Sequence, residues 1–159
     1  MKTKIIALGA VLSAVLLSAF LLSGCSENKT EDKLAATDNA VTYNKEGLVK
    51  IPINTITGKL KKFDYDASGI KVTYFAILGS DSKVRTAFDA CDVCGGKKGY
   101  RQTGANITCN NCGRVFSIDG LGTKNKGYGC WPSYLPHEIK DGQMVIKTAD
   151  LEAGAFRFV

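Results

Sequence analysis

The chain has 159 residues, six cysteines, one histidine and a formal net charge of +6. This length suits one folded domain, and no internal repeat indicates a second one. Nucleophile-elbow, phosphate-loop, HExxH and CxxCH motifs are all absent, which argues against the common hydrolase, nucleotide-binding, zinc-protease and c-type haem classes. We therefore predict that the protein is not a catalyst.

Residues 1–24 have the pattern of an export signal. Lys2 and Lys4 precede a long apolar run that ends in the tetrapeptide Leu22–Cys25. A basic start, an apolar centre and small residues before a cleavage point are typical of secretory signals. The tetrapeptide resembles the bacterial lipobox, so we predict that Cys25 is lipidated and holds an extracytoplasmic lipoprotein on the membrane. The alternative is a plain transmembrane anchor, because the apolar run approaches spanning length.

Residues 25–42 are polar, charged and without hydrophobic periodicity, which predicts a flexible tether. The folded domain is then expected over residues 43–159. Apolar and polar side chains alternate over residues 49–54, and Pro52 is expected to restrict that strand to a sheet edge. Next, residues 61–65 and 70–78 flank a turn and predict a hairpin, whose second strand is buried on both sides.

Further strands are expected at residues 107–109 and 114–118, around the second cysteine pair. A second hairpin is expected around Asp141-Gly142, a strong turn dipeptide. Residues 81–90 are the best helix candidate, and residues 156–159 are a candidate closing strand. The predicted fold is mostly β: a single small β-rich domain that contains a glycine-rich subdomain with two cysteine pairs at residues 91–136.

Two Cys-x-x-Cys pairs are the strongest chemical signal in the chain. They are Cys91/Cys94 and Cys109/Cys112, and a glycine follows each pair. Four thiolates at such spacing can surround one zinc or iron ion or a small iron–sulfur cluster. Glycine after each pair allows a tight turn and lets backbone N–H groups approach the sulfurs.

Three uses of these thiols remain open from the residues alone. A disulfide framework suits an oxidising compartment, but the five cysteines beyond Cys25 leave one thiol over. A disulfide within one CxxC pair would instead make this a thiol–disulfide redox protein, although the alternating strands and helices of thioredoxin are missing. Zinc-ribbon knuckles would hold a structural zinc ion, and export argues against a nucleic-acid partner despite the basic charge. Iron–sulfur ligation is the third use, and Cys130 is a candidate fifth ligand.

The order of motifs after Cys112 is similar to the second half of a Rieske domain, with a Gly-Arg-Val-Phe segment, a glycine-rich loop and a Leu-Pro end. Rieske centres need one histidine in each ligand box, whereas both boxes here are CxxC and the only histidine, His137, lies outside them. All-thiolate ligation would give a lower potential than a Rieske centre. His137 is therefore expected to be a loop or strand residue.

The segments DACDVCG, KGYRQ, ITCNNCGRVFSIDGLGTKN and GCWPSYLP resemble the FtrD-like membrane iron–sulfur domain family, from about residue 46 to the C-terminus. The resemblance implies cluster ligands at Cys91, Cys94, Cys109 and Cys112. It also implies an iron–sulfur cluster, such as [2Fe–2S], or a single iron, with zinc as the alternative. Its members are bacterial, membrane-associated and often linked with iron uptake. The implied function is extracytoplasmic electron transfer with a membrane-bound redox or iron-transport partner.

The surroundings of the cysteines carry further expectations. Tyr100 and Phe116 are expected to be core aromatics beneath the two pairs, while Trp131 and Tyr134 are expected to cover the site and exclude water. Basic residues gather in the same part of the sequence, as a solvated face or as compensation for a negatively charged thiolate centre. These residues are Lys97, Lys98, Arg101, Arg114, Lys124 and Lys126.

Overall fold

The computed structural model describes residues 41–44, 46–94, 97–127 and 129–159. The predicted export signal, Cys25 and most of the predicted tether lie outside the described residues. The first strand begins at Thr42, the last residue of the predicted tether. Within the described part of the chain, no helix has both the length and the apolar character needed to span a membrane.

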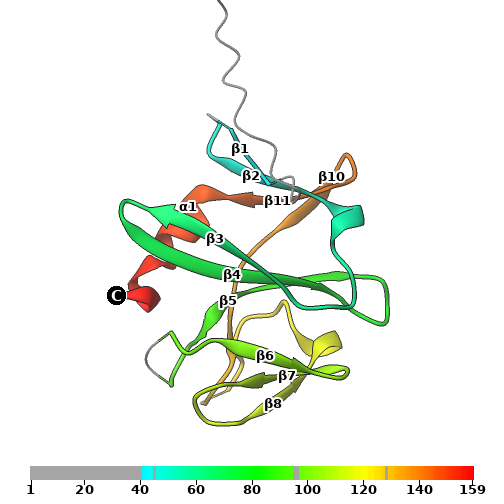
Figure 1. Cartoon of the computed structure of the whole chain (residues 1–159), viewed down its shortest axis with the longest axis vertical. Coiled ribbons are helices and arrows are strands. Elements are labelled where there is room, and N and C mark those ends of the chain that lie inside the picture. The colour runs from blue at the N-terminus through cyan, green and yellow to red at the C-terminus, as the bar shows by residue number, and fades with distance from the viewer. Residues whose placement is uncertain (1–40, 45, 95–96, 128) are drawn as a thin grey trace, which may run out of the picture. The chain divides into compact units, whose positions relative to one another are not determined.

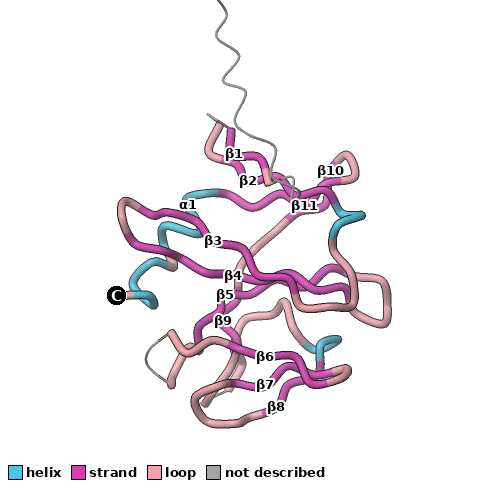
Figure 2. Tube along the Cα trace, in the orientation of Figure 1, coloured by secondary structure: helices cyan, strands magenta, loops and turns pink. Residues whose placement is uncertain are grey.

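The described residues form three antiparallel sheets and little helix, which confirms the mostly β prediction (Figures 1 and 2). The first sheet has the order β1-β2-β11-β10, with strands Thr42–Asn44, Leu48–Pro52, Gln143–Lys147 and Glu138–Lys140. The second has the order β3-β4-β5-β9, with strands Lys61–Ala67, Ile70–Leu78, Val84–Cys91 and Pro132–Tyr134. The third has the order β6-β7-β8, with strands Tyr100–Thr103, Asn106–Cys109 and Val115–Ser117. The helical segments are η1 (Ile53–Thr55), η2 (Ile118–Gly120), α1 (Thr148–Ala153) and η3 (Ala155–Phe158).

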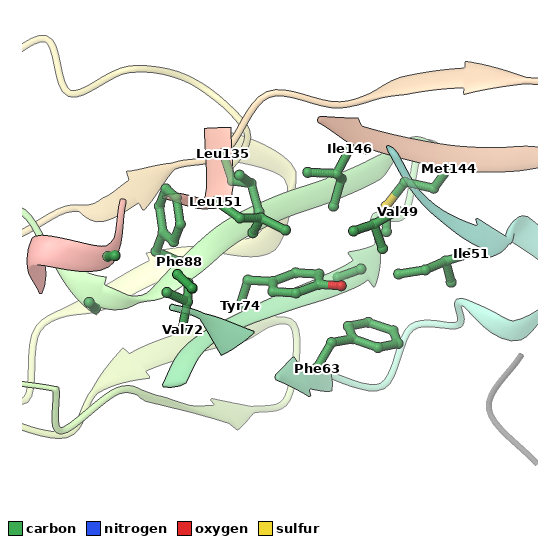
Figure 3. Close-up of a cluster of buried hydrophobic side chains, with 14 of the residues drawn as sticks. Val49, Ile51, Phe63, Val72, Tyr74, Phe88, Leu135, Met144, Ile146 and Leu151 are labelled. Carbon is green, nitrogen blue, oxygen red and sulfur yellow. The ribbon is translucent and has the colours of Figure 1, made fainter. Parts of the chain in front are cut away.

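The second sheet lies between two hydrophobic cores, because successive side chains of a strand point to opposite faces. On β4, Tyr74 belongs to the core shared with the first sheet, while Phe75 belongs to the core shared with the third sheet. Both side chains are fully buried, as predicted for this strand. In the first core, Tyr74 stacks on Phe63 with ring centroids 5.4 Å apart, and Val49 of the first sheet packs into the same cluster (Figure 3).

Both predicted hairpins are present and have two-residue loops. Ser68 and Gly69 connect β3 to β4 with φ angles of 53° and 87°. Asp141 and Gly142 connect β10 to β11 with φ angles of 51° and 72°. Two consecutive positive φ angles match the type I′ turn, whose twist suits the flanking strands and whose backbone favours Asp and Gly.

The helix predicted over residues 81–90 is wrong, because Val84–Cys91 forms strand β5. Val84 and Phe88 stand four positions apart, as on one face of a helix. Pairing with β4 on one side and β9 on the other decides the conformation instead. The first seven residues of β5 are buried, so both faces of the strand are covered.

Two other local predictions are also wrong. Residues 156–159 do not form a strand: η3 covers Ala155–Phe158 and places the Phe158 ring in the first core. Strand β2 is not an edge strand, since it pairs with both β1 and β11. Pro52 is tolerated because it is the last residue of β2 and lies beyond Lys50, the end of the pairing with β1.

Candidate metal centre

Three parts of the fold bring five cysteines to one place between the second and third sheets. Cys91 ends β5 and Cys94 follows in the next loop, while Cys109 ends β7 and Cys112 lies in the turn before β8. Cys130 comes from the loop before β9. It is placed beside the first pair because β9 runs antiparallel to β5 and the Asp92 N–H donates to the Trp131 carbonyl at 3.1 Å.

Four of the five sulfurs form a compact group. The Sγ atoms of Cys94, Cys109, Cys112 and Cys130 all lie within 4.8 Å of one another. Cys91 stands outside this group, with its Sγ 3.2 Å from that of Cys130. The structure therefore brings together three of the four ligands predicted from the sequence, and it adds the candidate fifth ligand to them.

The second cysteine pair lies in a closed turn. The Gly113 N–H donates to the Cys109 carbonyl and the Cys109 N–H donates to the Arg114 carbonyl, both at 2.9 Å. Gly113 has a φ of 74°, which a side chain would disfavour. This turn aims the Arg114 N–H at Cys112 and lowers the pKa of that thiol to about 7.

The first pair also directs backbone N–H groups at sulfur. Cys91 Sγ accepts from the N–H groups of Val93 and Cys94, at 3.5 and 3.4 Å. Burial acts to raise the pKa of Cys91, but these two donors, together with hydrogen bonds from the thiols of Cys130 and Cys94, outweigh it and bring the pKa to about 7. The hydrogen bond with Cys91 raises the pKa of Cys94 to about 11, and burial raises that of Cys130. A bound cation would displace the protons of such thiols.

One contact that sequence reasoning missed joins the two cysteine loops. The Asn111 side-chain amide donates to the Cys94 carbonyl at 3.0 Å. Asn111 lies between the two cysteines of the second CxxC motif. Only this position could have indicated the contact from the sequence.

Edge-to-face aromatic contacts lead from the second core to the site. Ring centroids are 6.1 Å apart for Phe75 and Tyr100, 6.2 Å for Tyr100 and Phe116, and 5.4 Å for Phe116 and Trp131. Tyr100 and Phe116 are buried, as predicted. The Trp131 indole N–H donates to the Thr123 carbonyl at 2.9 Å, which ties the Cys130 loop to these rings.

The Tyr100 hydroxyl is a buried donor without a hydrogen-bond partner among the described residues. Burial is the main cause that raises its pKa, and the neighbouring thiols of Cys91, Cys130 and Cys109 act in the same direction. Buried polar groups in native proteins are nearly always satisfied. A thiolate is a stronger acceptor than a thiol, so sulfurs that carry charge, as metal ligands do, would suit this phenol.

His137 is separate from the sulfur group. Its Nδ1 lies 2.9 Å from the Thr86 hydroxyl, and that hydroxyl donates to the Leu135 carbonyl at 2.7 Å. Burial is the main cause that lowers the His137 pKa. His137 lies in the loop between β9 and β10, which is one of the placements predicted for it.

Fold and site together define a class: a small β protein of three sheets, with a thiol-rich candidate metal centre between the second and third sheets. The chain belongs to the family described as membrane iron-sulfur containing protein FtrD-like, which it matches over residues 56–158. It is thus an iron-related, metal-binding protein of a membrane-associated family, as the resemblance implied. No curated protein and no solved structure matches the chain.

Proposed function

We propose that this protein holds an iron centre through cysteine thiolates on the extracytoplasmic side of a membrane and transfers single electrons in iron reduction or uptake. The observation that carries the proposal is the group of four mutually close sulfurs at Cys94, Cys109, Cys112 and Cys130. A bound iron would supply one-electron chemistry, and a membrane-bound redox or iron-transport protein would be the partner.

The spacing of the sulfurs favours one ion over a cluster. Metal–thiolate bonds of about 2.3 Å in a tetrahedron place the sulfurs about 3.8 Å apart. In a two-iron cluster, two thiolates bind each iron and the two pairs lie farther from each other. All four sulfurs of this group lie within 4.8 Å of one another, which suits a mononuclear site.

The chain's own residues would control the potential of this centre. Backbone N–H groups next to Cys91 and Cys112 donate toward sulfur and favour its negatively charged form. Phe116 and Trp131 pack edge to face in the apolar cluster that contains Cys109 and Cys130, and apolar surroundings of this kind would influence the potential. Lipidation of Cys25 would confine encounters to the membrane surface.

A structural zinc site is the second candidate, since zinc prefers the same closed set of four thiolates. The protein would then be an interaction module on the membrane rather than an electron carrier. The metal content of the purified protein distinguishes the iron electron carrier from the structural zinc module. We expect full-length protein purified without oxygen to contain about one iron per chain and no acid-labile sulfide. One zinc per chain without colour would support the second candidate, and metal-free protein with a reducible disulfide would contradict both.

The membrane attachment has its own test. We expect a radiolabelled or clickable fatty acid to be incorporated into the wild-type chain in cells and to be absent from Cys25→Ser. Equal labelling of both chains, or membrane retention of the unlabelled variant, would contradict anchoring through Cys25.

A further inference from the structure

A pocket of about 300 Å³ opens directly beside the sulfur group. Its described lining carries three cationic side chains, Arg114, Lys124 and Lys126, and no carboxylate. Cys130, one of the four close sulfurs, forms part of the wall. A molecule in this pocket would therefore lie against a proposed ligand of the metal.

Hydrogen bonds hold the loop that forms this pocket. Besides the Trp131–Thr123 bond, the Asn125 amide donates to the Gly129 carbonyl at 3.1 Å and the Gly127 N–H donates to the Asn125 side chain at 3.1 Å. These contacts close the loop that carries both lysines and tie it to Trp131, so both lysines stay at the rim of the pocket.

Arg114 also lines the pocket, and it comes from a different segment of the chain, immediately before β8. Its guanidinium lies 5.9 Å from the centroid of the Phe116 ring. A Cβ atom at Gly129 would come within 2.9 Å of the guanidinium, so the absence of a side chain at this position leaves room for the charge. Cations from two separate segments thus converge on one hollow.

We infer that this pocket binds a small polycarboxylate anion, and that it takes such an anion as the carrier of the ferric ion that the centre reduces. The inference rests on the proposed function for its redox part. The volume is at the lower end of small-molecule sites, and three cations without a counter-charge select a multiply charged anion. In the redox step, one electron would pass from the reduced centre to the chelated ferric ion, which would become ferrous. No atom passes to or from the protein, and a low-potential one-electron donor, dithionite in the experiment, restores the centre.

Binding is tested first, without redox chemistry. Citrate and redox-inert gallium(III) citrate are titrated calorimetrically into as-isolated full-length protein. We expect saturable binding of gallium citrate, weakened about tenfold or more in Lys124→Ala/Lys126→Ala because two charge contacts are lost. The matched control, Lys59→Ala/Lys147→Ala, removes two exposed lysines outside the pocket and should bind within about twofold of wild type. The charge-conserving variant Lys124→Arg/Lys126→Arg should bind gallium citrate as wild type does.

Electron transfer is tested second, on dithionite-reduced and desalted protein. The pocket variant should reduce ferric citrate more slowly, whereas its reduction of the cation hexaammineruthenium(III) should be unchanged or faster. Absence of saturable binding to the wild type, or equal binding by the pocket and control variants, would overturn the inference. A shifted midpoint potential with unchanged anion binding would show that the lysines only offset the charge of the centre, which also overturns it. If the protein proves to hold zinc, the proposed function fails while the calorimetric result still decides the anion site.

Discussion

The sulfur atoms of Cys91 and Cys130 lie 3.2 Å apart although the two residues are 39 positions apart in the chain. The site therefore offers five sulfurs where a tetrahedral ion needs four. Cys130 is close to all three remaining cysteines, whereas Cys91 stands outside that group. If Cys130 is the fourth ligand, the site is the compact mononuclear one. If Cys91 is the fourth ligand, the ligands are the two CxxC pairs predicted from the sequence, whose sulfurs do not all lie within 4.8 Å of one another.

The first prediction concerns this choice. We expect Cys130→Ser to lose most of its bound metal and Cys91→Ser to keep about one equivalent, because only Cys130 completes the compact group. Metal-to-protein ratios after anaerobic purification provide the measurement, with Cys109→Ser as the control that should lose metal in either case. The opposite pattern would restore the ligand set predicted from the sequence and would contradict a site completed by Cys130.

The second prediction concerns the buried Tyr100 hydroxyl. A phenol that donates to a thiolate stabilises the reduced, more negative centre, so Tyr100→Phe should lower the midpoint potential. The expected shift is about 40 mV, which corresponds to about 1 kcal/mol of hydrogen-bond energy in a one-electron couple. Spectroelectrochemistry measures the shift. Tyr74→Phe is the matched control, because it removes an equally buried hydroxyl from the other core. Equal potentials for all three proteins would contradict this role.

The third prediction concerns pH. Burial is the main cause that lowers the pKa of His137 in the fold, with a smaller contribution from Arg85 and an opposing hydrogen bond with Val84. The unfolded chain then binds a proton more readily, so the free energy of unfolding should fall as the pH drops through about 6.5, the ordinary histidine value. Below the folded-state pKa, His137 is protonated in both the folded and the unfolded chain, so the free energy of unfolding falls no further on its account.

Urea unfolding between pH 5 and 8 tests this effect, and His137→Asn should flatten the profile in that window. His137 is the only histidine in the chain, so its imidazole NMR signals report its folded pKa directly. A folded pKa at or above the ordinary value would contradict the prediction.

The fourth prediction concerns packing beneath η3. A Cβ atom at Gly154 would overlap the Phe88 ring, although the φ of −85° at Gly154 is accessible to any residue. Gly154→Ala should therefore destabilise the fold by about 1–3 kcal/mol through overpacking. Gly120→Ala is the control, because nothing lies within 4 Å of the corresponding atom and the change should be nearly neutral. Similar unfolding temperatures for both variants would show that the Phe88 ring moves without cost.

Features that depend only on residues adjacent in the sequence could be predicted. The prediction of a hairpin at Asp141-Gly142 was confirmed, because these two residues favour the backbone angles of the turn. The CxxC pairs indicated a thiol site because short spacing alone brings two sulfurs together. For residues 81–90, the local pattern gave a wrong prediction. Their apolar spacing suits a helix, and only pairing with β4 and β9 makes Val84–Cys91 a strand.

The sequence by itself determined the chemistry of this protein, since cysteine supplies soft ligands and the following glycines permit tight turns wherever the chain goes. Which sulfurs meet was decided by the tertiary structure alone. Cys130 reaches the group through the pairing of β9 with β5, a contact between distant segments that no local pattern encodes. The same folding brings Arg114 close to Lys124 and Lys126, so that three cations from two separate segments line one pocket beside the Cys130 sulfur.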